Sequence, residues 1–249
     1  MQNIDFVEVG RVQALNRFPV KSMRGESPTE VHLYWHGLDG DRRYAFVRGD
    51  NQSGFPWLTG RQIPDMVRYT PRFTNPDDVI QSSIEVETPN GRFHPIDSPE
   101  LRAELAAAYG NDVSLIKIGR GVFDSQVVSL MSVETAVALS DAVERPLSTD
   151  RFRQNIVIET YSGEPFVEES WLDGVLLFGD RGDGARIRLN RRISRCVMIN
   201  IDPDTGEKDA HVLKMVTTQR DNCVGVHASP ENPGTIHVGD VVRFCKTCR

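Results

Sequence analysis

Short runs of β-branched and aromatic residues, separated by turn-forming residues, dominate the chain. Such runs are typical of strands. They predict strands at residues 31–34, 44–47, 84–86, 113–118, 155–159, 175–178 and 196–201. From Ala185 to Leu189 apolar residues alternate with arginines, which predicts a strand with one buried face and one polar face carrying Arg186 and Arg188.

Capping residues and apolar spacing predict two helices. The first begins after Ser98 at a proline and ends at Gly110, and the second begins at Ser132 and ends before Pro146. The residues expected to face the core are Leu101, Leu105 and Ala108 in the first helix and Val133, Ala136 and Val137 in the second.

Strands outnumber helices and do not alternate with them, which disfavours a doubly wound parallel sheet. The pattern predicts a mainly β fold with a few helices (α+β), built as a barrel or a mixed arrangement. The turn-rich stretch at residues 119–121 is the expected boundary between two β-rich parts, residues 1–118 and 119–249.

Composition narrows the class of protein. With 249 residues, 39% of them hydrophobic and 26% charged, the chain resembles an ordinary globular protein. Its formal net charge of -6 argues against a nucleic-acid-binding surface, which needs clustered Lys and Arg. No stretch approaches the roughly 20 apolar residues of a membrane span, and the first residues do not resemble an export signal. We expect a cytoplasmic protein that binds neither nucleic acid nor membrane.

All four cysteines lie in the last quarter of the chain, at positions 196, 223, 245 and 248. Without an export signal a disulfide framework is not expected, and metal or redox chemistry is the competing explanation. Cys223, His227, Cys245 and Cys248 have spacing that could form a tetrahedral zinc site. The alternative is a frayed, solvent-exposed cysteine pair at the terminus.

Common nucleotide and calcium motifs are incomplete. A dinucleotide-like glycine spacing begins at Gly119, but Asp124 occupies the third glycine position. The segment 202–206 resembles the start of a calcium loop but lacks its later glycine and glutamate, so it is interpreted as a hairpin turn. Neither a nucleophile elbow nor a phosphate-binding lysine loop occurs in the sequence.

Several segments combine cations with hydrogen-bonding residues near predicted strand ends. They are residues 19–22 (PVKS), 41–43 (DRR), 59–62 (TGRQ) and 151–155 (RFRQN). Each by itself could be a solvated turn or an ion-paired surface. Because arginine binds phosphate and oxo anions bidentately, their convergence would create a local anion pocket in an otherwise acidic protein.

The segment Ser194-Arg195-Cys196 lies between a basic stretch and an apolar run. Nearby cations favour the thiolate form of cysteine, which is the form that binds a soft metal. The alternative interpretation is a small core residue beside a strand.

Taken in order, these segments resemble the MOSC proteins, named for the molybdenum cofactor sulfurase C-terminal domain. The resemblance is closest to the two-part members that include the amidoxime-reducing components and their bacterial relatives. The matching stretches are residues 18–22, 37–47, 58–62, 152–156, 194–196, 201–206, 231–236 and 238–240. They span nearly the whole chain.

The resemblance implies an N-terminal β-barrel-like domain (1–118), a MOSC β-barrel domain (119–249) and a molybdenum–molybdopterin cofactor in the cleft between them. It implies that Cys196 is the catalytic molybdenum ligand. The other implied cofactor contacts are Lys21, Ser22, Arg42, Asp124, Ser125, Gln126, Arg153, Asn155, Ser194, Arg195 and His227. Arg43 is the alternative to Arg42 if the alignment shifts by one residue.

The implied activity is that of an oxidoreductase that reduces small N-hydroxylated or N-oxide-type substrates at the molybdenum. His227 and Gln126 differ from the residues usual in amidoxime reducers. Of the inferences from the resemblance, the choice of substrate is the one that these differences affect most. The Cys-x4-Cys-x2-Cys spacing of a plant-type iron–sulfur domain does not occur in the sequence. Electrons are therefore expected from a separate iron–sulfur, flavin or cytochrome protein. The alternative is a carrier without redox turnover, which holds sulfur on Cys196 as a persulfide or stores the cofactor.

Overall fold

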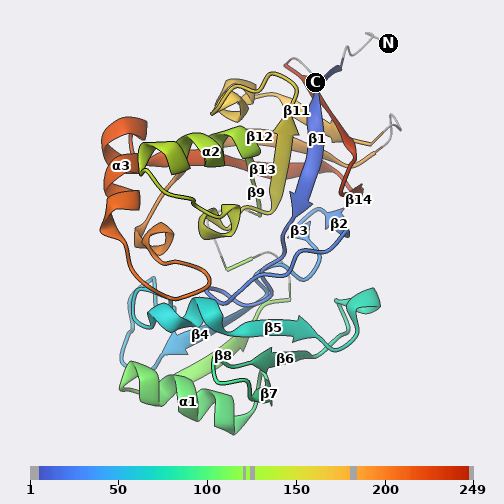
Figure 1. Ribbon diagram of the computed structural model, residues 1–249. Helices are drawn as coiled ribbons and strands as arrows, with labels where there is room; N and C mark the ends of the chain where they lie inside the picture. The colour runs from blue at the N-terminus through green and yellow to red at the C-terminus, as the bar shows by residue number, and fades with distance from the viewer. Residues whose placement is uncertain (1–5, 120–121, 124–126, 180–183, 247–249) are drawn as a thin grey trace.

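The structure is a computed structural model that describes residues 6–119, 122–123, 127–179 and 184–246. Two lobes lie one above the other, and a closed barrel forms most of the upper lobe (Figure 1). The described part contains many short strands and three α-helices, so the expected fold class, mainly β with few helices, is confirmed.

Seven strands close the barrel. In spatial order they are β1 (Val7–Leu15), β10 (Ile156–Thr160), β9 (Val128–Ser132), β13 (Cys223–Asn232), β12 (Arg186–Ser194), β11 (Val175–Phe178) and β15 (Val241–Cys245). The β9–β10 pair is parallel and the other pairs are antiparallel. Because β1 pairs with both β10 and β15, the barrel combines the start of the chain with its second half. The division at 118/119 stays a prediction.

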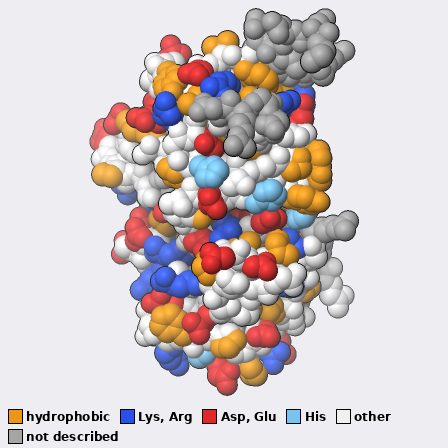
Figure 2. All heavy atoms as spheres, turned by 90° about the vertical axis from the view of Figure 1, so that its right-hand side faces the viewer, with side chains coloured by type: hydrophobic (Ala, Val, Ile, Leu, Met, Phe, Trp, Pro, Cys, Tyr) orange, Lys and Arg blue, Asp and Glu red, His pale blue; other side chains and the backbone are white. Residues whose placement is uncertain are grey.

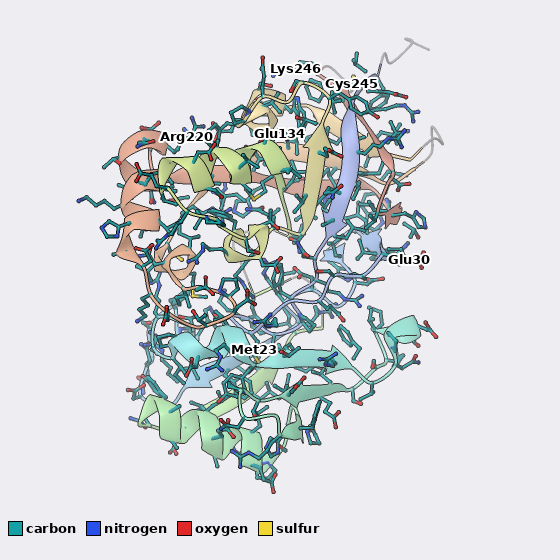
Figure 3. The ribbon with its side chains drawn as sticks, in the orientation of Figure 1. Met23, Glu30, Glu134, Arg220, Cys245 and Lys246 are labelled. Carbon is teal, nitrogen blue, oxygen red and sulfur yellow. The ribbon has the colours of Figure 1, made fainter. Side chains whose placement is uncertain are left out.

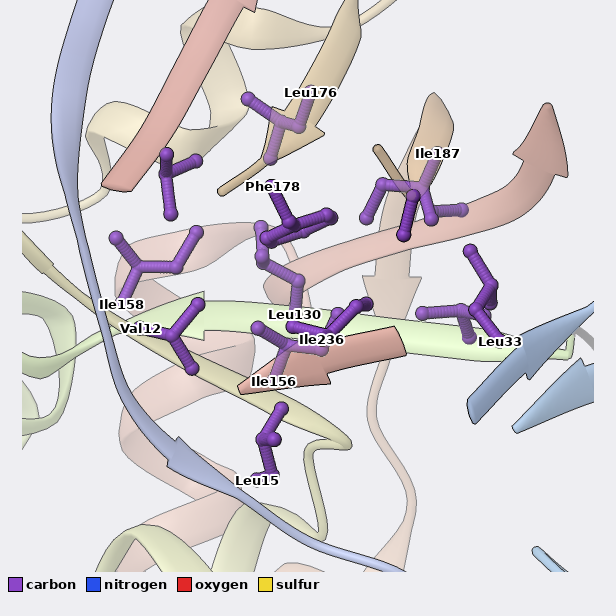
Figure 4. Packing of buried hydrophobic residues seen from close by; sticks show 14 of the residues in the cluster. Val12, Leu15, Leu33, Leu130, Ile156, Ile158, Leu176, Phe178, Ile187 and Ile236 are labelled. Atoms are coloured by element: carbon purple, nitrogen blue, oxygen red, sulfur yellow. The ribbon is translucent and has the colours of Figure 1, made fainter. Parts of the chain in front are cut away.

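The barrel encloses the largest described hydrophobic cluster. Strand β12 places Ile187 and Leu189 inside and leaves Arg186 and Arg188 half-buried on the other face, as the alternation predicted. Figure 4 shows side chains from several strands meeting there, among them Leu130 and Ile158. Burying each such side chain contributes about 1.5–3 kcal/mol, so the barrel is a rigid support for anything held at its end.

The lower lobe has its own core. Its elements are β4 (Tyr44–Arg48), β5 (Thr70–Phe73), β6 (Ile84–Glu87), β7 (Phe93–Pro95), β8 (Val113–Lys117) and α1 (Pro99–Tyr109). Phe46, Leu101 and Leu105 are fully buried within it. A further three-stranded sheet, in the order β14 (Gly234–His237), β2 (Glu30–Tyr34) and β3 (Gly37–Leu38), again joins the two parts of the chain.

The two predicted helices are confirmed, together with their caps. Ser98 Oγ accepts a hydrogen bond from Leu101 N at 3.2 Å, and Gly110 ends α1 in the left-handed conformation with φ 84°. Ser132 likewise caps α2 (Val133–Ala142). The predicted apolar stripes are partly wrong, because Ala108 and Val137 are exposed. The buried face of α2 is formed instead by Thr135, Ala136 and Leu139.

The structure differs from the sequence analysis at two further places. The helix α3 (Ala210–Arg220) was not predicted. The strand expected at 196–201 is wrong, since Val197–Asn200 forms a 3-10 helix, η5, with Ile199 N bonded to Cys196 O at 3.2 Å. The β-branched run favours a strand, but the chain turns here, where Met198 and Ile201 pack closely against Gly60 of the lower lobe.

The remaining 3-10 helices are η1 (Pro64–Arg68), η2 (Pro76–Asp78), η3 (Thr149–Phe152) and η4 (Val167–Trp171). None of the helices in the described ranges is long and apolar enough to span a lipid bilayer. The face seen in Figure 2 mixes acidic, basic and histidine side chains around the junction of the lobes, and no single charge covers it.

Candidate functional site

A cavity of about 220 Å³ lies between the lobes. It brings together eight of the residues that the sequence singled out. These are Lys21, Ser22, Arg42, Arg153, Ser194, Arg195, Cys196 and His227. Asp124, Ser125 and Gln126 lie outside the described residues, so the loop that carries them stays a prediction.

The cavity is strongly cationic. Its walls carry Lys21, Arg42, Arg61, Arg151, Arg153 and Arg195, and none of the described residues that line it is an Asp or Glu. The whole chain has a net charge of -6. The cationic segments found in the sequence therefore do converge, and they form a local anion-attracting pocket.

Arg42 links the two lobes at the back of this pocket. Its Nη1 donates to Asp41 Oδ2 at 2.6 Å and to Asn155 Oδ1 at 3.2 Å, and its Nη2 donates to the carbonyl oxygen of Arg153 at 2.9 Å. Asp41 is 0% exposed, and its Oδ1 also accepts from the backbone N–H of Phe18 at 2.8 Å. Arg43 donates instead to the carbonyl oxygens of residues 118 and 119, so Arg42 is the arginine that faces the cavity.

Both Arg42 and Arg153 lie over the ring of Phe18. Their Cζ atoms are 4.7 Å and 4.3 Å from its centroid, which is within the range of cation–π contacts. Arg153 also donates from Nη1 to Met23 O at 2.7 Å, and Met23 lies at the junction of the lobes in Figure 3. A Cβ on Gly25 would come within 2.6 Å of the Phe18 ring, so the ring is held tightly in place.

Three of these residues adopt left-handed backbone conformations. The φ angles are 67° at Ser22, 45° at Arg42 and 54° at Arg153. Side chains other than glycine rarely adopt this region, and each instance costs about 1 kcal/mol or more. Such strain persists where surrounding structure enforces it, and it is often found at functional sites.

Asn155 lies behind the wall rather than on it. Its Oδ1 accepts from Arg42 and from the N–H and Oγ of Ser129, at 3.1 and 2.9 Å, and its Nδ2 donates to Asn16 O at 3.2 Å. Ser129 and His227, which face each other in the β9–β13 pair, both line the cavity. Asn155 thus ties the barrel wall to Arg42.

Cys196 lines the same cavity from the end of a barrel strand. Cys196 is a free thiol, half-buried, between the end of β12 and η5. The preceding Arg195 donates from Nε to Val224 O and from Nη1 to Phe152 O, both at 2.9 Å. These bonds fix the backbone that presents the thiol to the cavity.

Gln154 Oε1 and Arg151 Nε are buried polar atoms in the cavity wall for which the described residues provide no hydrogen-bond partner. Burial lowers the pKa of the Arg151 guanidinium. Burial would raise the pKa of its partner Asp202, but backbone N–H groups and Arg151 lower it below the ordinary value. An unsatisfied buried group costs about 1–3 kcal/mol, so these atoms suit a ligand with both donors and acceptors.

The zinc hypothesis for the C-terminal cysteines is not supported. Cys245 takes part in a disulfide, so its sulfur is not available as a thiolate ligand, while Cys223 is free. Cys248 lies outside the described residues. Within the described ranges, no cluster of three or more His, Cys, Asp or Glu side chains could hold a metal ion.

Reasoning from the sequence missed several residues that line the cavity, among them Phe55 and Ser129. Ser129 belongs to a fully buried strand, where a hydroxyl gives no periodic signal. Phe55 follows the polar stretch Asn51-Gln-Ser-Gly54, and an aromatic residue directly after such a stretch is the signal that could have found it.

Comparison with known families and proteins covers nearly the whole chain. Residues 9–112 match the family model of the MOSC N-terminal beta barrel domain, and residues 110–243 match that of the MOSC domain. Mitochondrial amidoxime-reducing component 1 from Homo sapiens is 30% identical, over 94% of this chain and 83% of that protein. Its Mus musculus counterpart is 25% identical, over 94% and 82%.

A solved structure is similar as well. The crystal structure of the YUAD protein from Bacillus subtilis has a TM-score of 0.54 over 98% of this chain and 100% of that chain, at 11% identity. At that identity the likeness concerns the fold alone.

Proposed function

This chain belongs to the MOSC domain family, and on that premise we propose that it binds a molybdenum cofactor in the cavity between the lobes and reduces N-hydroxylated or N-oxide-type substrates there. The curated relatives are named amidoxime-reducing components, which supports the choice of an N–O bond as the substrate bond.

One observation carries the proposal. The free thiol of Cys196 shares a single cavity with Lys21, Arg42 and Arg153, which come from both lobes. A thiolate is a suitable ligand for a soft metal, and guanidinium and ammonium groups are suitable partners for a phosphate. A phosphorylated, metal-carrying cofactor requires both kinds of group at once.

The described residues also fit the rest of such a cofactor. Arg42 and Arg153 present guanidinium groups for a phosphate, with Lys21 and the buried Ser22 beside them. The unpaired Gln154 Oε1 and Arg151 Nε suit the hydrogen-bonding edges of a pterin. Ser194, Arg195 and His227 complete the wall around Cys196, Asn155 holds Arg42 from behind, and Asp124 to Gln126 are further proposed contacts.

When bound, the cofactor supplies a metal that takes up and delivers two electrons. Reduction of an N-hydroxylated amine consumes two electrons and two protons and yields the amine and water. The protein's share is to bind and orient the substrate beside Cys196. We propose that a separate protein supplies the electrons.

Turnover by the purified protein tests the proposal. The chain is produced in a host that makes the cofactor and, as a matched control, in a strain that cannot make it. With a chemically reduced viologen as electron donor, we expect the first preparation to convert an amidoxime to its amidine and the second to be inactive. A molybdenum-loaded preparation without turnover would overturn the reductase assignment and favour the carrier interpretation.

A further inference from the structure

An exposed aromatic ring lies at the mouth of the cavity. Phe55 is 45% exposed, although it lines the cavity. The other aromatic side chain among the described lining residues, Phe152, is fully buried. Leaving a large apolar group in water is unfavourable, so an exposed ring at the entrance of a polar site suggests a binding surface.

The loop that carries Phe55 is held through hydrogen bonds to its backbone carbonyl oxygens. Arg48 donates from Nη2 to Phe55 O at 2.8 Å and from Nε to Pro56 O at 3.3 Å. Two residues further on, Trp57 packs against Phe123 with ring centroids 4.8 Å apart. The backbone position of Phe55 is therefore set before any ligand arrives, which lowers the entropy cost of binding.

Beside the ring is an arginine that has no other partner among the described residues. The Cζ atom of Arg61 is 5.7 Å from the Phe55 centroid, and the described structure gives its guanidinium no hydrogen bond or ion pair. Its backbone is fixed, since Arg61 N donates to Thr59 Oγ1 at 3.3 Å and Thr59 Oγ1 donates to Gln62 Oε1 at 3.0 Å. The mouth thus offers a flat apolar face next to free N–H donors.

We propose that Phe55 and Arg61 form a substrate clamp that selects flat, conjugated N-hydroxylated molecules. The ring of Phe55 stacks on the conjugated body of the substrate, and Arg61 donates to the oxygen of its N–O group. This inference rests on the proposed reductase function and names the substrate class for that site. A small aliphatic substrate uses Arg61 but gains nothing from Phe55.

The test compares benzamidoxime with acetamidoxime, which carry the same reacting group on an aromatic and a methyl body. Dissociation constants are measured by calorimetry on oxidised, cofactor-loaded protein without an electron donor, and KM and kcat follow with the donor present. For Phe55→Ala we expect Kd and KM for benzamidoxime to rise about fivefold to tenfold, several times more than the same constants for acetamidoxime.

Further variants separate the aromatic face from simple bulk. Phe55→Leu should raise the Kd for benzamidoxime as much as Phe55→Ala does. Phe55→Tyr should keep the wild-type Kd, because stacking requires a ring. Arg61→Gln should weaken both substrates by the same factor. Phe93→Ala, which removes an exposed ring from β7 outside the cavity, should change neither substrate.

Failure of the clamp and failure of the reductase assignment give different results. Wild-type turnover with unchanged benzamidoxime constants in Phe55→Ala, or equal losses for both substrates, would refute the clamp alone. Molybdenum-loaded wild type that turns over neither substrate would refute the reductase assignment. The calorimetric Kd still tests the clamp in that case. If wild type and Phe55→Ala bind benzamidoxime equally tightly, the clamp is refuted.

Discussion

The guanidinium of Arg42 crosses the junction of the lobes and donates to the carbonyl oxygen of Arg153 at 2.9 Å. The guanidinium of Arg153 lies over the same phenyl ring as that of Arg42, the ring of Phe18. Two like charges would repel each other in a buried site. The ring and the buried carboxylate of Asp41 hold them in place before a ligand arrives, which preorganises an anion site.

If Phe18 positions these arginines, Phe18→Leu should reduce cofactor retention beyond what its loss of fold stability explains. We expect unfolding free energy to fall by about 1–2 kcal/mol and the molybdenum retained after gel filtration to fall about threefold to tenfold. Phe46→Leu, in the separate core of the lower lobe, is the matched control. It should lose similar stability and keep its molybdenum, and an equal loss of metal in both variants would contradict the positioning role.

Asp41→Asn removes the carboxylate that pairs with Arg42. Removing one partner of a buried ion pair costs about 3–5 kcal/mol, and the retained amide should reduce the loss to about 2–3 kcal/mol. We expect this loss in urea unfolding of cofactor-free protein. In cofactor-loaded protein the loss should be smaller, because the phosphate supplies a negative charge to Arg42. Equal losses in the two forms would argue against a phosphate beside Arg42.

Gln154→Leu separates stability from binding. The substitution removes a fully buried acceptor that has no partner among the described residues, so cofactor-free protein should unfold at an equal or higher temperature than wild type. Pterin content should nevertheless decrease. A variant that is less stable and retains its full pterin content would show that Gln154 serves the fold and not the ligand.

Glu168 predicts a pH dependence of stability away from the site. Burial raises the pKa of its carboxyl above the ordinary value, although Thr135 and Ser132 partly oppose the shift through hydrogen bonds. Between the unfolded and the raised folded pKa the native state binds more protons, so stability falls as pH rises through that range. The melting temperature of Glu168→Gln, measured relative to that of wild type, should therefore be higher at pH 8 than at pH 4. A constant difference in melting temperature across this range would contradict the shifted pKa.

Local signals predicted the parts of the fold that local physics determines. The Ser98 cap and the left-handed Gly110 fixed both ends of α1, and the alternation around Ile187 identified β12. Helix α3 was missed although its signals exist, since Asp209 caps it and Val212, Met215 and Val216 form its buried face. The strand predicted at residue 196 failed because contacts with Gly60, distant in sequence, outweigh β-propensity there.

The sequence was enough to predict many of the residues that line the cavity, but not their arrangement in space. Cations near strand ends identified Lys21, Arg42 and Arg153, yet only the fold brings them together with Cys196. The buried partner of Arg42, Asp41, is its sequence neighbour and could have been found. Phe18 and Phe55 act through positions that depend on pairing between distant segments, which sequence spacing does not encode.

Metal and pterin content of two cysteine variants tests the central claim most directly. Wild type, Cys196→Ser and Cys223→Ser are purified from a host that makes the cofactor. The Cys223→Ser variant changes the other free cysteine, which is not among the residues lining the cavity. We predict near-stoichiometric molybdenum in wild type and Cys223→Ser, and a loss of about tenfold or more in Cys196→Ser. Full molybdenum together with full amidoxime reduction in Cys196→Ser would contradict the account.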